Sequence, residues 1–175
     1  MSETPQTIPS SFPEKTEIAI PAFGSSPALI LPISRIREGE NRLHESKIVN
    51  AASYSELEYV FNEGYREAKK NIVSLEYETT KASKAIEDAK ALALIDHYND
   101  FLRDKKLKDS ADIRAAFLQQ RPDYTSAVDR VNMLKAVTSL MEGKVKVFEN
   151  VCRVMKKAMD LEIRSGIIDN NKYMR

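Results

Sequence analysis

The side chains best suited to binding chemistry lie between residues 98 and 108. Two aromatic residues, Tyr98 and Phe101, come first, and a run of cations follows them: Arg103, Lys105, Lys106 and Lys108. Single-stranded nucleic acid is bound by cations that contact phosphates and by rings that stack on bases. The segment is therefore a candidate nucleic-acid site. The same residues also fit a solvated helix end, where positive charge complements the helix dipole and the rings shape a turn.

A second group of cations lies further along the chain. Lys146, Arg153, Lys157 and Arg164 fall on roughly one face of a helix with 3.6 residues per turn. Such a stripe can follow a phosphate backbone or pair with an acidic partner. In a ring of subunits, many weak stripes would act together through avidity, and the resulting DNA binding would depend strongly on salt.

Residues suited to catalysis are scarce. The sequence has no glycine-rich phosphate loop, no cysteine pair for zinc and no Gly-x-Ser-x-Gly turn. Asp96, His97 and Asp100 form the one compact titratable cluster, and surface charge explains it better than a metal or catalytic site. Cys152 lies in an apolar pattern typical of a packed thiol. We expect no catalytic site, cofactor or metal, and an enzyme built on the Asp96 cluster is the least favoured alternative.

Long helices must position these candidates. From Leu57 to Ala93 an apolar or small residue recurs at almost every third or fourth position, which predicts one long helix. Ser55 and Glu58 have the spacing of a capping box, so the helix should begin near residues 53 to 55. It should end near residue 102, directly before the first run of cations.

Two further helices are predicted after the cations. A residue at 109 or 110 can cap a short helix over 111–120, which Pro122 ends. A second long helix then begins near residue 123, and its apolar residues again recur every three or four positions. Gly166 is a suitable residue for the C-terminal end of that helix.

The two long helices are expected to fold back on each other as an elongated antiparallel helical hairpin or coiled coil. A two-helix hairpin leaves much of each apolar seam in water, and packing against further copies removes that exposure. The sequence therefore predicts an all-α homo-oligomer. The side chains expected between copies are Leu57, Phe61, Ile72, Leu75, Ile86, Val145, Phe148, Cys152, Met155 and Met159.

The N-terminal part of the chain differs in composition, because six of the seven prolines lie between residues 5 and 32. Proline fixes φ and lacks an amide donor, so residues 1 to about 27 are predicted to form an extended or disordered arm. Residues 34–50 are compatible with a short helix. The sequence thus divides into an N-terminal arm over residues 1–52 and a helical oligomerisation and binding domain over residues 53–175.

Several residues of the arm are too apolar for a linker. They are Ile18, Ile20, Phe23 and the residues from Leu29 to Ile33. They either cover the helical body as an extended strap or dock onto a neighbouring subunit or another protein.

Overall composition restricts the possible classes of protein. The 175 residues include 27 Lys and Arg against 26 Asp and Glu, a balance typical of solvated helix faces rather than of a strongly basic nucleic-acid-binding protein. No apolar run approaches the ~20 residues that span a bilayer, and no secretory signal is evident, so we expect no membrane partner. The single cysteine forms no internal disulfide, which fits a cytoplasmic location.

Three segments resemble a known family: Ala89–Phe101, Val147–Ala158 and Ile163–Ile168. With the lysine-rich connection between two long helices, this layout over residues 53–170 resembles the recombination mediator UvsY family of T4-type phages. The resemblance implies a ring-shaped helical homo-oligomer that binds single-stranded DNA, helps displace the single-strand-binding protein and loads a recombinase in the host cytoplasm. The family places its DNA-contacting cations just before the tyrosine-containing turn, whereas this chain has Leu92, Ala93 and Leu94 there and its cations after the turn.

These observations predict a non-enzymatic recombination mediator that binds single-stranded DNA as a homo-oligomer. The alternative is a phage virion, scaffold or adaptor protein, in which the helices serve only to build an assembly.

Overall fold

The computed structural model describes residues 15–23, 27–45 and 51–172, with side-chain surroundings given for 53–165 of the last range. Over these residues the chain forms a small antiparallel sheet and a set of helices, and the prediction of a mostly helical protein is confirmed. The sheet was not predicted. In chain order the elements are β1 (Glu17–Ile20), β2 (Leu29–Pro32), α1 (Ser34–Glu45), α2 (Ala51–Asp96), α3 (Tyr98–Lys105), α4 (Ala111–Gln119) and α5 (Pro122–Lys172).

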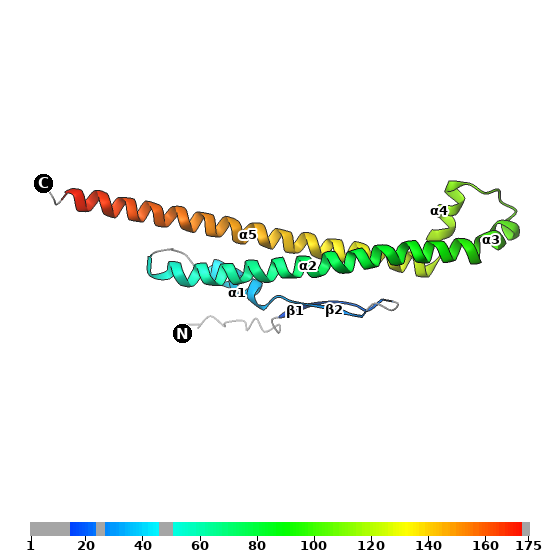
Figure 1. Ribbon diagram of the computed structural model, residues 1–175, viewed down its shortest axis with the longest axis horizontal. Coiled ribbons are helices and arrows are strands. Elements are labelled where there is room, and N and C mark those ends of the chain that lie inside the picture. Colours follow the sequence, from blue (N-terminus) through cyan, green and yellow to red (C-terminus); the bar gives the residue numbers. More distant parts are fainter. Residues whose placement is uncertain (1–14, 24–26, 46–50, 173–175) are drawn as a thin grey trace, which may run out of the picture.

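The body of the molecule is a rod made of α2 and α5, which run antiparallel and side by side (Figure 1). Small side chains such as Ala68, which is 0% exposed, let the two helices approach, and larger ones such as Leu75 and Leu134 fill the contact. The rings of Phe61 and Phe148 meet with centroids 6.2 Å apart. This arrangement agrees with the elongated antiparallel helical hairpin predicted from the sequence.

The apolar seams of the two helices are covered within one chain, which corrects the expectation that they need a second copy. Phe61, Leu75, Phe148 and Met155 are each at most 2% exposed, and they share one cluster with side chains of the N-terminal segment. Of the other residues predicted to lie between copies, Leu57, Ile72 and Val145 are buried, and Ile86, Cys152 and Met159 are half-buried. The buried members of this set are therefore not available for an association between chains, which needs other exposed side chains.

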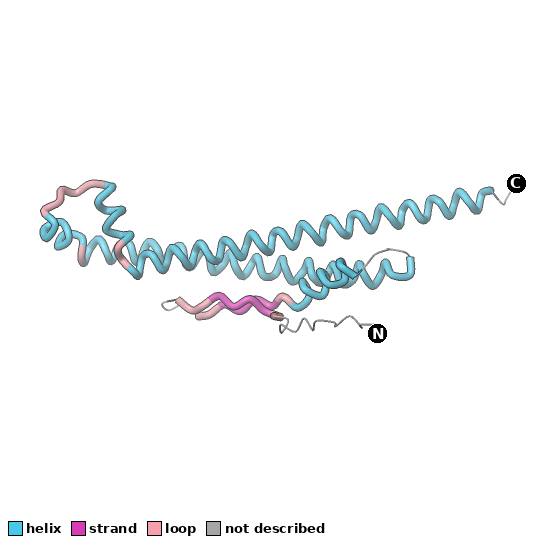
Figure 2. The backbone as a smooth tube through the Cα atoms, turned by 180° about the vertical axis from the view of Figure 1, so that it is seen from behind, coloured by secondary structure: helices cyan, strands magenta, loops and turns pink. Residues whose placement is uncertain are grey.

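The N-terminal segment forms a hairpin that lies along the rod (Figure 2), not an extended arm. Strands β1 and β2 pair antiparallel, with Ile18 opposite Leu31 and Ile20 opposite Leu29. Ile20 and Leu31 are each 1% exposed and belong to the main hydrophobic cluster. The described part of the arm therefore covers the helical body as a strap, and residues 1–14 and 24–26 of the predicted arm lie outside the description.

Prolines are compatible with this hairpin because of where they fall. Pro21 follows β1, Pro27 precedes β2 and Pro32 ends β2, so none interrupts the middle of a strand. The connections to the rod are polar. Asn71 of α2, 2% exposed, donates its side-chain amide to the Pro32 carbonyl at 2.7 Å, and Arg130 of α5 donates to the carbonyls of Pro21 and Pro27.

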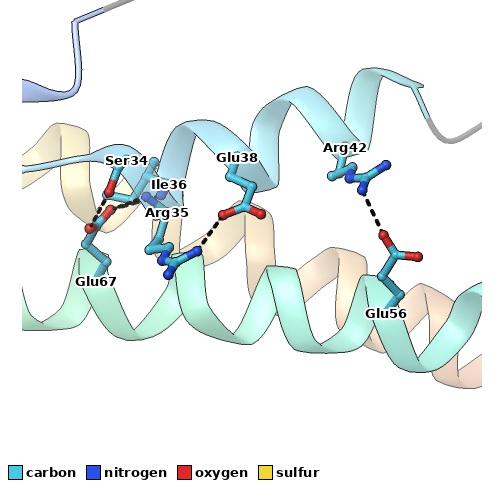
Figure 3. A network of polar contacts seen from close by, with 7 residues as sticks. All are labelled: Ser34, Arg35, Ile36, Glu38, Arg42, Glu56 and Glu67. Carbon is cyan, nitrogen blue, oxygen red and sulfur yellow. Dashed lines mark hydrogen bonds and ion pairs between the residues drawn. The ribbon is translucent and has the colours of Figure 1, made fainter.

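Helix α1 is held on α2 by a cap that comes from α2 itself (Figure 3). The Glu67 carboxylate accepts the backbone amides of Arg35 and Ile36 at 2.9 and 3.0 Å, and so pairs N–H groups that the first turn of a helix leaves free. Further along, Arg42 forms an ion pair with Glu56 at 2.7 Å. These contacts fix the short helix that the sequence allowed over residues 34–50; its residues 46–50 lie outside the description.

Several helix ends differ from the prediction. Helix α2 begins at Ala51, before Ser55, so Ser55 lies inside the helix and does not act as its cap. It ends at Asp96 rather than near residue 102, and α3 follows as a separate helix. Helix α5 runs on to Lys172, so Gly166 does not end it. Helix α4 begins as predicted, with the Ser110 hydroxyl accepting the Ile113 amide at 3.2 Å.

Candidate binding surfaces

The tip of the rod, defined here as residues 96–123, contains a small aromatic core. Tyr98 is 6% exposed, and its ring centroid lies 6.4 Å from that of Phe101 and 5.3 Å from that of Phe117. Phe101 and Phe117 are 5.0 Å apart, and Leu118 is buried beside them. These rings pack α3 against α4.

The Tyr98 hydroxyl and two charged residues fix the connection between α3 and α4. Tyr98 donates to Asp109 Oδ1 at 2.8 Å, and Arg114 donates to both oxygens of the same carboxylate. The hydrogen bonds from Arg114 and then from Tyr98 lower the pKa of Asp109 to about 2. Burial, followed by the bond to Asp109, raises the pKa of Tyr98.

The packing of the two aromatic rings bears on their two predicted roles, stacking on bases and shaping a turn. Base stacking needs a ring with an accessible face, and the Tyr98 ring is enclosed by its neighbours. Tyr98 therefore shapes the turn, which was the second of its two predicted roles. Phe101 is half-buried and faces the same core.

The cations predicted to contact phosphates at the tip are exposed but are balanced by acids. Arg103 forms an ion pair with Asp100 at 2.6 Å, and Lys105, Lys106 and Lys108 all lie on the surface. The tip contains equal numbers of basic and acidic side chains. The basic ones are Arg103, Lys105, Lys106, Lys108, Arg114 and Arg121, and the acidic ones are Asp96, Asp100, Asp104, Asp109, Asp112 and Asp123. The tip is thus close to neutral, a weak basis for phosphate binding.

The turn at the tip is tightly defined. Lys106 follows α3 with φ 51° and ψ 39°, in the left-handed region, and its amide bonds back to the Arg103 and Leu102 carbonyls. This closes α3 in the way glycine often does. The backbone of Lys106 is thus held in place by the C-terminal end of α3.

The second group of cations remains together on α5. Lys146, Arg153, Lys157 and Arg164, called the cationic row below, are all exposed. Arg153 donates to Asn150 of the same helix at 2.8 Å. The row extends over ~27 Å at 1.5 Å per residue. Lys144, which precedes it, is instead paired with Glu40 of α1.

Sequence reasoning missed a line of exposed apolar residues on α5. Met133, Leu140, Val147, Val154 and Leu161, called the outer row below, follow one another at every seventh position. They are 45%, 47%, 40%, 63% and 66% exposed, respectively. The spacing was visible in the sequence, but the stronger seam of Leu134, Met141, Phe148 and Met155 on the same helix concealed it.

The residues considered for catalysis lie in two separate parts of the rod, the Asp96 cluster in the tip and Cys152 on α5. Asp96, His97 and Asp100 are exposed, and Asp100 is paired with Arg103. Cys152 lines a groove of about 530 Å³ between α2 and α5, and burial raises the pKa of its thiol, which keeps it in the protonated, less nucleophilic form. Among the described residues, no group of three or more His, Cys, Asp or Glu side chains is placed to hold a metal ion.

Within the described part of the chain, no helix combines the length and apolar character needed to cross a bilayer.

Comparisons with protein-family models, with curated proteins and with solved structures find no match for this chain. The resemblance to the UvsY family stays a prediction, and the functional conclusion rests on the surfaces of α5 and the tip.

Proposed function

We propose that this protein is a structural or adaptor protein that works as a homo-oligomer of long helices. The observation that carries the proposal is the C-terminal part of α5, which continues past the first residues of α2 (Figure 1). Every residue from Asp160 to Ser165 is exposed. A helix gains most of its stability in a protein from packing rather than from its own hydrogen bonds, so this part of α5 is suited to packing against another chain.

The outer row supports the same proposal. Contiguous apolar surface is uncommon on monomeric proteins and often marks a site of association. Here the exposed apolar side chains form a line along a rigid helix, and none of them is needed to fill the core around Phe148. A rod with such an edge is well suited to side-by-side assembly.

The test is the mass of the full chain in solution, measured by light scattering after size-exclusion chromatography at micromolar concentrations. The proposal predicts a mass of two or more chains, each of 19.8 kDa. A mass of a single chain over the whole concentration range would contradict it.

The cationic row favours a second candidate function, in which the oligomer binds single-stranded DNA as a recombination mediator. Its partners would then include a recombinase and a single-strand-binding protein. Lys146, Arg153, Lys157 and Arg164 share one exposed face, so they could contact successive phosphates. In this candidate the row on α5 is the main contact and the nearly neutral tip is a minor one.

Fluorescence anisotropy with labelled oligo-dT tests this second candidate. The triple charge reversal of Lys146, Arg153 and Lys157 to Glu should weaken binding about 10-fold or more at low salt. The matched tip variant, Lys105→Glu with Lys106→Glu, should weaken it much less. Absence of binding by the unchanged protein at 50 mM salt would reject the candidate, and equal losses in the two variants would reject the assignment to α5.

A further inference from the structure

We propose that two copies of this chain associate through the outer row, with their α5 helices antiparallel about a two-fold axis at Val147. This inference rests on the proposed function, because it names the surface and the partner of the assembly. The partner is a second copy, and its matching surface is the same row on its own α5.

The outer row is separate from the apolar series that packs α5 against α2. On the inner side of α5, Met141, Phe148 and Met155 are buried at every seventh position, and the next residue of that series is Glu162, which is exposed. The inner series thus stops being apolar where α2 no longer covers α5. The outer row continues to Leu161, beyond that point.

The spacing of the outer row indicates that its partner is a helix. Apolar residues at every seventh position, with a second series four residues further on, form the contact line of two packed helices. On α5 the positions four residues further on are half-buried; Val137, Val151 and Ala158 are apolar, and the fourth, Lys144, is paired with Glu40 of α1. The line from Met133 to Leu161 is ~42 Å long at 1.5 Å per residue.

A two-fold arrangement lets the same line cover itself. If Val147 lies opposite Val147 of the second copy, Leu140 lies opposite Val154, and Met133 lies opposite Leu161. The more exposed C-terminal members of the row thus meet the less exposed N-terminal ones. Each of the five side chains then has an apolar partner, as expected for an interface that uses one patch on both subunits.

The charges beside the row favour the antiparallel orientation. In that register Asp129 lies within one residue of the position opposite Arg164, so the two opposite charges come together, and the two-fold axis repeats this pair; both residues are exposed. The same register sets Lys157 opposite Val137. In a parallel pairing Arg164 would instead lie ~52 Å along the helix from Asp129 of the other copy, at 1.5 Å per residue, and these opposite charges would not meet.

Cysteine cross-linking in a Cys152→Ser background tests the surface and the orientation together. Val147→Cys lies on the proposed axis and should form a disulfide-linked dimer under mild oxidation. Val154→Cys lies ~21 Å from its copy along the helix and should not. Cross-linking of both variants would indicate a parallel dimer and overturn the orientation. Failure of Val147→Cys in a protein that is oligomeric by light scattering would overturn the surface.

Substitutions in the row give a second readout, the mass in solution. Val154→Arg and Leu161→Arg should each convert the dimer to a single chain at micromolar concentration, because they place a cation in an apolar contact. Both side chains are more than 60% exposed, so circular dichroism should show the same helix content as the unchanged protein. Val73→Arg, at a 66% exposed apolar position on α2, is the matched control and should leave the mass unchanged.

Charge exchange tests the register. Asp129→Arg and Arg164→Asp should each weaken the dimer several-fold, and the double variant should restore it. An oligomer that tolerates the arginine substitutions in the row would overturn this inference while leaving the proposed homo-oligomer intact. A single chain at all concentrations would overturn the proposed function itself.

Discussion

At the scale of single residues, the ring of Phe148 is closely packed at the place where α1, α2 and α5 meet. A Cβ added to Gly39 would lie 2.6 Å from Phe148 Cε1, and one added to Gly64 would lie 2.8 Å from Phe148 Cζ. Phe148 is 0% exposed and packs against Phe61. Both glycines approach the outer end of the ring, Gly39 from the Cε1 side and Gly64 from the Cε2 side.

Gly39→Ala and Gly64→Ala should therefore each destabilise the protein. Overpacking of a closed core costs about 1–3 kcal/mol, which offsets the gain of about 1 kcal/mol that alanine brings to a helix. Urea unfolding, followed by circular dichroism at one protein concentration, measures the free energy of unfolding. Gly143→Ala is the control: a Cβ there would meet nothing within 4 Å, so this variant should be as stable as the unchanged protein or more so. Destabilisation by Gly143→Ala alone would contradict this account.

The contact between Asp109 and its two donors predicts a dependence of the tip on pH. Arg114 and Tyr98 lower the folded-state pKa of Asp109 from 3.8 to about 2. The contribution of Asp109 to stability is therefore complete above about pH 4, and it is lost as the pH falls towards 2. Carboxyl chemical shifts in an NMR titration should report this value.

Arg114→Ala should move the pKa of Asp109 back towards 3.8, because it removes the largest cause of the shift. Arg103→Ala is the control, since Arg103 is paired with Asp100 and not with Asp109. An Asp109 that titrates near 3.8 in the unchanged protein would contradict the observed hydrogen bonds.

Residue types alone were enough to predict the candidate binding residues, but they did not predict which side chains would contact them. The sequence showed that Tyr98 and Phe101 precede a run of cations. It did not show that Asp109 would return to the Tyr98 hydroxyl, because that contact depends on the fold of the turn between α3 and α4. It also gave no sign that Phe117, which lies on the next helix, would enclose the Tyr98 ring.

At the scale of elements, the hairpin of β1 and β2 depends on one buried cation of α5. The guanidinium of Arg130, 6% exposed, donates to the carbonyls of Pro21 and Pro27 and lies 3.8 Å from the Glu78 carboxylate. Removal of this side chain leaves the two carbonyls and the carboxylate without their cation. Without these contacts, the hairpin of β1 and β2 should separate from the rod more easily than in the unchanged protein.

Arg130→Met should lower the free energy of unfolding by about 1.5–3 kcal/mol, the range for hydrogen bonds to a charged group. It should also speed thermolysin cleavage near Phe23 and Leu29. Lys135→Met, an exposed position on the same helix, is the control and should change neither measurement. Cleavage at the same rate in Arg130→Met would mean that the hairpin is held by its apolar contacts alone.

Elements with strong local signals could be predicted, and those set by distant contacts could not. Helix α4 and its Ser110 cap follow from local sequence, as does the period of α2 and α5. The hairpin was missed because prolines argued against a strand, although they fall at its ends. The cap of α1 was hidden because its carboxylate, Glu67, comes from α2.

At the scale of the whole molecule, the elongated antiparallel arrangement was predictable but the role of its seams was not. A helix periodicity shows that a face is buried, and it does not show whether the same chain or another copy buries it. Here α1 and the hairpin cover residues such as Leu57 and Phe61, so the main seam closes within one chain. The surface left for association is the less prominent outer row.

The most direct test of that central claim is an intermolecular distance. A nitroxide label on Asp160→Cys, in the Cys152→Ser background, lies near the outer row without replacing any of its members. In the antiparallel dimer centred on Val147, pulsed dipolar spectroscopy should give a distance of about 40 Å between the two labels, from 1.5 Å per residue along the helix. A distance well below 20 Å, or no dipolar interaction between chains, would contradict it.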